Sequence, residues 1–88
     1  MRSSVSTKVR TAPEQYSYTV IFQPLAEGGY EVVVPAIPEI CTFGQTLPEA
    51  RRMAKDAIRC FLESALKSGE PIPKDLEPFT EEVAVALP

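Results

Sequence analysis

The side chains that could do chemistry here are two thiols and a set of carboxylates, because the 88 residues include no histidine. Histidine is the commonest general base and metal ligand, so its absence removes the usual partner for a thiol or a zinc ion. Cys41 and Cys60 also lack the C-x-x-C spacing of zinc and redox motifs. We interpret them as reduced, partly buried cysteines, and we expect neither a metal site nor a cofactor.

The carboxylates in the predicted elements do not form an obvious catalytic set. A two-metal nuclease needs several acids that converge on the ions, whereas the first predicted strand, residues 16–23, contains no acid. Glu49 is better explained by a helix cap, and Glu31, Asp56 and Glu63 by solvated faces. We therefore predict that the protein is not an enzyme.

A helix over residues 46–66 is the element around which these side chains are arranged. Thr46 and Glu49 have the spacing of a capping box, in which the Thr hydroxyl accepts from the Glu amide and the Glu carboxylate reaches back. Pro48 suits the first turn, and Gly69 suits a left-handed C-terminal cap. Apolar residues repeat every three or four positions, which predicts one buried stripe. The other face carries Arg52, Asp56, Arg59, Glu63 and Lys67, with opposite charges four residues apart.

Four segments have the alternation or β-branched composition of strands: residues 16–23, 30–34, 40–43 and 82–87. Gly28 and Gly29 supply the turn between the first two. A strand, helix, strand crossover favours parallel pairing of its two strands. The order β-β-β-α-β predicts an α+β fold, with a mixed four-stranded sheet and one long helix packed on one face.

The strand periodicity also predicts which side of the sheet meets the helix. We expect the bulkier side to do so, and it carries Val20, Phe22, Tyr30, Val32 and Val34. The opposite side, with Ile21, Val33, Ala84 and Ala86, would remain uncovered. Uncovered apolar surface on a small domain usually marks an interface, so a homo-oligomer, dimer or tetramer, is expected.

Composition and charge limit the domain organisation and the kinds of partner that remain possible. The net charge is −3, although residues 1–14 contain three basic residues and one acid. We read residues 1–14 as a flexible basic tail and residues 15–88 as one folded, acidic domain. An acidic surface repels phosphate, so direct nucleic-acid binding is not expected. Without a membrane-spanning run or signal-peptide core, we expect a cytoplasmic protein.

Three pieces of sequence, taken in order, resemble the HicB family. They are G-G-Y-x-V-x-V-P-A-I-P from residue 28, T-x-G-x-T-x-x-E-A from residue 42, and G-x-P-I-P from residue 69. The resemblance runs from about residue 16 to residue 88. Its pattern residues, which we interpret as structural, are Gly28, Gly29, Tyr30, Pro35, Pro38, Thr42, Gly44, Thr46, Glu49 and Ala50.

The resemblance implies a reduced RNase H-like fold and an antitoxin that covers HicA, a small basic RNA-cleaving toxin. Family members that repress their own operon carry an additional C-terminal DNA-binding domain, and we expect none here. Our hypothesis for the partner surface is an acidic rim of Glu27, Glu31 and Glu39 beside the sheet, chosen for charge and exposure.

Two alternatives stay open. One is a stand-alone oligomeric adaptor, in which the bare sheet face pairs subunits and no toxin exists. The other is nucleic-acid binding through the basic tail and the helix cations Arg51, Arg52, Lys55 and Arg59, although acids interleave with them.

Overall fold

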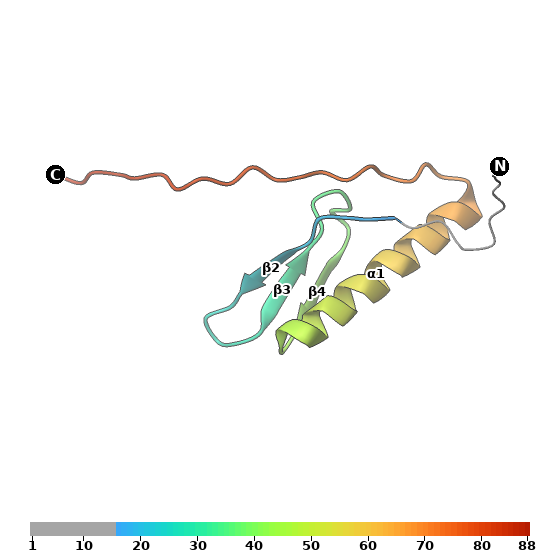
Figure 1. The fold of residues 1–88 in the computed structure, drawn as a ribbon, viewed down its shortest axis with the longest axis horizontal. Coiled ribbons are helices and arrows are strands. Elements are labelled where there is room, and N and C mark those ends of the chain that lie inside the picture. The colour runs from blue at the N-terminus through green and yellow to red at the C-terminus, as the bar shows by residue number, and fades with distance from the viewer. Residues whose placement is uncertain (1–15) are drawn as a thin grey trace, which may run out of the picture.

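The computed structural model describes residues 16–88, so the predicted tail, residues 1–14, lies outside the described residues. The described chain forms strands β2 (Ile21–Pro24), β3 (Tyr30–Val33) and β4 (Cys41–Gly44), then helix α1 (Leu47–Ser68). The strands make an antiparallel sheet in the order β2-β3-β4, and α1 lies across one face of it (Figure 1). The α+β class is therefore confirmed.

The hairpin of β2 and β3 forms as expected but is shorter than predicted. Gly28 and Gly29 have φ values of 106° and 84°, and the pairing runs from Pro24 opposite Tyr30 to Ile21 opposite Val33. Because β3 ends at Val33, residues 16–20 have no partner strand and are extended but outside the sheet. The predicted first strand, residues 16–23, is thus reduced to residues 21–23 and extended to Pro24.

The helix begins and ends where the capping residues indicate. The Glu49 N–H donates to Thr46 Oγ1 at 3.2 Å, and Gly69 closes the C-terminus with a left-handed φ of 73°. One detail of the predicted capping box is wrong, since the Glu49 carboxylate accepts from the N–H of Gln45, at 3.0 Å, and not from Thr46. The local sequence therefore fixes the helix as a continuous rod.

The core lies between α1 and the side of the sheet that was predicted to meet it. Val32 packs with Ala50 and Ala54, and a second cluster forms around Val34 and Ile37. Alanines on the helix allow its axis to approach the sheet closely, and larger buried side chains come from the sheet and the β3–β4 connection. Residues packed at the margins include Val20, Phe22, Tyr30, Tyr18, Ile58 and Phe61.

The predicted fourth strand does not form in the chain's own sheet. Residues 82–87 are exposed and have no strand partner among the described residues, so the described sheet has three strands and is antiparallel, not mixed. We call residues 76–88 the C-terminal arm. It runs past the end of the sheet and projects beyond it (Figure 1). The alternation of this segment is a property of its sequence, but pairing needs a neighbouring strand edge, which the arm does not approach.

Candidate functional site

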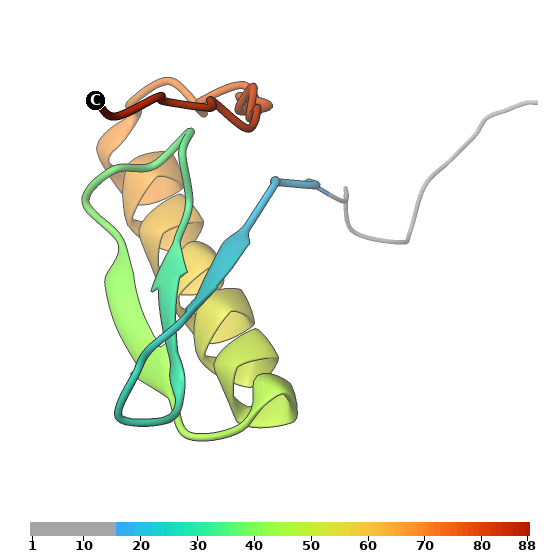
Figure 2. The same cartoon turned by 90° about the vertical axis from the view of Figure 1, so that its left-hand side faces the viewer.

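One face of the sheet is open to solvent. Side chains alternate along each strand, and the face opposite α1 carries Glu31, Val33, Cys41 and Phe43 on β3 and β4. Phe43 is 43% exposed, and Cys41 is also exposed. The view in Figure 2 shows α1 on the far side of the sheet. Within residues 16–88, no helix or strand packs on this open face.

The three glutamates proposed as an acidic rim are spread along this face. Glu31 lies on β3 and is half-buried, whereas Glu27 and Glu39 are exposed in the β2–β3 turn and the β3–β4 connection. Successive connections of an antiparallel sheet lie at opposite ends, as Figure 2 shows. The structure therefore does not gather the three carboxylates into a cluster, but places one at each end of the sheet and one between them.

The residues of the sequence pattern occupy positions that shape the backbone. A Cβ atom on Gly44 would overlap the backbone of Ala50, so glycine lets β4 pass directly against the start of α1. Pro35 and Pro38 lie in the β3–β4 connection, where the N–H of Ile37 donates to the Val34 carbonyl. Gly28, Gly29, Thr46 and Glu49 form the turn and the cap described above. These positions hold the sheet and helix in register.

The cysteines differ from their predicted burial. Both are free thiols, but both are exposed, so the expectation that they are partly buried is wrong. Cys41 lies on the open face, with its Sγ donating to Glu31 Oε2 at 3.7 Å, and Cys60 lies on the solvated side of α1. No group of three or more His, Cys, Asp or Glu residues suited to a metal ion occurs among residues 16–88.

A groove on the other side of the molecule was missed by the sequence reasoning. It has a volume of about 1050 Å³ and runs between α1 and the extended chain that leads into β2. Phe22 and Ile58 contribute apolar lining, while Arg51, Lys55 and Arg59 contribute positive charge. Arg59 also pairs with Asp56 at 3.1 Å, in place of the predicted four-residue pairs. The signal for the groove was in the sequence, because the helix stripe continues to Leu66, beyond the reach of the sheet.

The segment just before the C-terminal arm is held beside this groove by hydrogen bonds. The Thr19 N–H donates to Asp75 Oδ1 at 2.8 Å, and the Thr19 hydroxyl donates to Oδ2 at 2.7 Å. The Tyr18 hydroxyl donates to the Pro73 carbonyl at 2.6 Å. The bonds from Thr19 lower the pKa of the Asp75 carboxyl, while burial is the main cause that raises the pKa of Tyr18. We call these contacts the arm anchor.

Comparison with known proteins assigns this sequence to a family. Residues 18–84 match the sequence model described as the HicB-like antitoxin of bacterial toxin-antitoxin systems. This match includes β2, β3, β4, α1 and most of the arm. The chain belongs to the HicB-like antitoxin family. The described chain also contains no helix that combines the length and apolar character needed to span a bilayer.

Individual relatives agree with the family assignment. The chain is 47% identical over 58 residues to UPF0150 protein Ta0767 of Thermoplasma acidophilum, covering 66% of this chain and 84% of that protein. It is 45% identical over 56 residues to Antitoxin HicB 1 of Photorhabdus laumondii, covering 64% and 36%. It is 36% identical over 72 residues to Antitoxin HicB of Escherichia coli, covering 80% and 52%. The chain thus spans about a third and about half of the two proteins named as antitoxins.

Proposed function

We propose that this chain binds and neutralises a small, basic, HicA-type RNA-cleaving toxin by protein–protein contact. The observation that carries the proposal is the family match over residues 18–84. We expect the chain to act in the cytoplasm together with this toxin. The fold described above supplies exposed surface for such contact.

The open face of the sheet is the surface we assign to the toxin. It presents an aromatic side chain, Phe43, next to Glu31, with Glu27 and Glu39 at its two ends. An RNA-cleaving enzyme needs a positive surface to hold phosphates, and carboxylates spaced along a flat face can take the place of those phosphates. Phe43 supplies apolar contact area of the kind that anchors interfaces.

The proposal is tested by co-expression with the small basic protein encoded beside this chain in its genome. Neutralisation is measured as recovered growth, and binding by co-purification and by a titration of the purified pair. We expect a complex in which the RNA-cleaving activity is lost. If no small basic protein is encoded there, or the two do not bind, the antitoxin proposal fails and the adaptor interpretation replaces it.

Charge reversal locates the surface once a complex is in hand. Glu31→Lys is expected to weaken binding at least tenfold, because it places a cation against a cationic partner in the middle of the face. Glu70→Lys makes the same charge change in the exposed segment that follows α1 and is the matched control. Equal effects of the two variants would show that the open face is not the contact surface.

A further inference from the structure

The groove beside β2 and the C-terminal arm are complementary in chemistry, although they do not touch. The groove is bordered on one side by β2, an edge strand whose outer side has no partner among residues 16–88. Unpaired N–H and C=O groups on an edge strand are a template for another strand. The groove floor is apolar, and it includes Val20, Phe22 and Ile58.

The arm carries apolar side chains that can fill this groove. Val83, Val85 and Leu87 are 70%, 75% and 86% exposed, and their spacing places them on one side of an extended chain. Apolar side chains exposed to water in this way usually mark a surface that binds another surface. It has the sequence of a strand and lacks only an edge to pair with.

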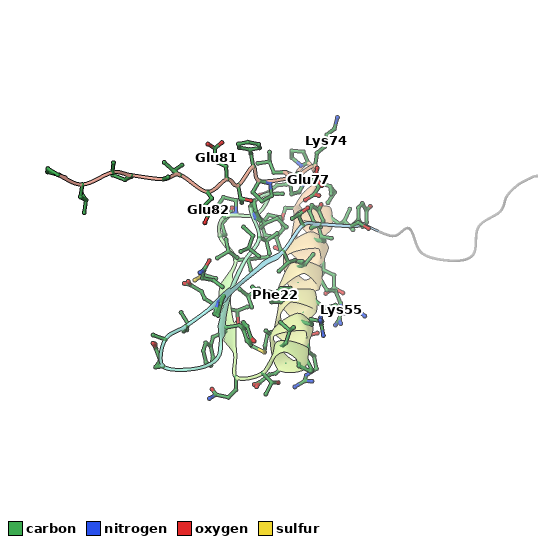
Figure 3. The ribbon with its side chains drawn as sticks, turned by 60° about the vertical axis from the view of Figure 1, so that its left-hand side comes forward. Phe22, Lys55, Lys74, Glu77, Glu81 and Glu82 are labelled. Atoms are coloured by element: carbon green, nitrogen blue, oxygen red, sulfur yellow. The ribbon has the colours of Figure 1, made fainter. Side chains whose placement is uncertain are left out.

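The charges of the arm and of the groove also favour their association. Three acids, Glu77, Glu81 and Glu82, precede or begin the alternating segment, whereas Arg51 and Lys55 line the groove (Figure 3). Arg59 and Glu63 also line it, so the balance of the lining is positive. Opposite charges on the two surfaces favour this pairing over pairing of the arm with the acidic open face.

The course of the arm after the arm anchor favours the groove of a second molecule over the groove of its own chain. Asp75 is held against Thr19, two residues before β2, and from there the arm runs straight past the end of its own sheet and does not follow β2 (Figure 1). To enter that groove, the chain would have to leave this straight course and bend toward β2 within residues 76–81. Residues 76–88, fully extended, reach about 40 Å, which is enough to cross into a neighbouring molecule.

We propose that two copies of this chain exchange their C-terminal arms. Residues 82–87 of each copy pair with the free edge of β2 on the other, and Val83, Val85 and Leu87 enter its groove. Because the exchange is reciprocal, the two copies are related by one two-fold axis, and each arm pairs with the free β2 edge of the other copy. It completes a four-stranded sheet between molecules and leaves both open faces free. It does not rest on the antitoxin function.

Cross-linking between two marked copies tests the exchange directly. In a Cys41→Ser, Cys60→Ser background, one tagged full-length chain carries Lys55→Cys and a differently tagged one carries Val85→Cys. After the two are unfolded together and refolded, a short bis-maleimide is expected to link one tag to the other. A single chain carrying both substitutions is then expected to run mainly as a linked dimer. An internal link at monomer mass would overturn the proposal, because the arm would then enter its own groove.

The oligomeric state provides the second readout. Sedimentation of the full chain is expected to give twice the chain mass, and Val83→Asp with Val85→Asp to give the monomer. Ala84→Asp is the matched control, since Ala84 alternates to the other side of the segment and should leave the dimer intact. Circular dichroism should show the same helix content in all variants, because the arm lies outside the core. A monomeric unsubstituted chain, or a dimer that survives both aspartates, would overturn the proposal.

Discussion

Single residues in this chain act mainly by allowing or directing the backbone. Gly44 illustrates the first role, since its missing Cβ is what lets β4 lie against Ala50 at the start of α1. Thr19 and Asp75 illustrate the second, because two hydrogen bonds between them hold the chain before the arm against the residues that lead into β2. Both effects involve residues that look unremarkable when the sequence is scanned for catalytic groups.

Substitution of Gly44 is expected to be costly. In Gly44→Ala the new methyl group would overlap the backbone of Ala50, which cannot rotate away, so the helix must shift from the sheet. Overpacking of this kind costs about 1 to 3 kcal/mol in the free energy of unfolding, measured by urea denaturation. Gly69→Ala is a comparison in which a Cβ meets no atom and only the left-handed φ is unfavourable, at about 1 kcal/mol. Equal costs would contradict the close packing at Gly44.

The arm anchor is expected to depend on pH. Because the folded-state pKa of Asp75 lies below its ordinary value of 3.8, the anchor's stabilisation is complete above that value. It is lost as the pH falls through the folded-state pKa, where the carboxylate takes up a proton. The Thr19 amide resonance should therefore titrate with a midpoint below 3.8. Asp75→Asn should abolish this titration, and a midpoint at or above the ordinary value would contradict the hydrogen-bonded anchor.

At the scale of elements, the structure is one helix set closely on a short hairpin and a third strand. The buried positions of α1 are Ala50, Ala54, Leu62 and Ala65, so three of its four buried side chains are methyl groups. The bulk of the core comes instead from the sheet and the β3–β4 connection, where Ile37 is fully buried. The fold therefore depends on small residues on the helix and large ones facing them.

This division of volume predicts that shortening a buried residue opposite the helix costs more than shortening an exposed residue on the helix. Ile37→Ala should cost about 2 to 5 kcal/mol, because it leaves a cavity between the connection and the helix. Leu66→Ala removes a similar volume from a side chain that is 59% exposed and should cost well under half as much. Thermal or urea unfolding measures both. A large loss of unfolding free energy for Leu66→Ala in the dimer, but not in the monomer, would instead show that Leu66 contacts the exchanged arm in the groove.

At the scale of the whole molecule, the distribution of surfaces separates two kinds of association. The open face carries Glu31 and Phe43, while the groove on the other side carries Arg51 and Lys55. A basic partner and a second copy of the chain can therefore bind without competing for one surface. Arm exchange would also add the burial that so small a domain lacks.

Association with a basic toxin is expected to weaken as salt rises. The chain has a net charge of −3, and electrostatic steering between exposed charges is screened within about 8 Å at physiological ionic strength. The association rate should fall at least tenfold between low and high salt, while the dissociation rate changes less. Stopped-flow binding measures both rates. A salt-independent association rate would assign recognition to apolar contact around Phe43.

The sequence by itself determined the elements that local chemistry specifies. The Thr46 and Glu49 spacing, the two glycines of the turn and the 3.6-residue stripe predicted α1, the hairpin and the packed face, because caps, positive φ angles and periodicity act within a few residues. The resemblance to HicB, carried by glycines and prolines that shape the backbone, was likewise readable and is confirmed by the family match.

Only the tertiary structure decided the extent of pairing and the fate of the apolar surface. Alternation in residues 82–87 indicated a strand, but a strand exists only against an edge, and beyond the Thr19 to Asp75 contacts the arm runs past its own sheet (Figure 1). The spacing of Glu27, Glu31 and Glu39 follows from the antiparallel order of the strands, and Cys41 is exposed because no helix or strand of the described chain covers the open face. These features join residues distant in sequence, so no local pattern could fix them.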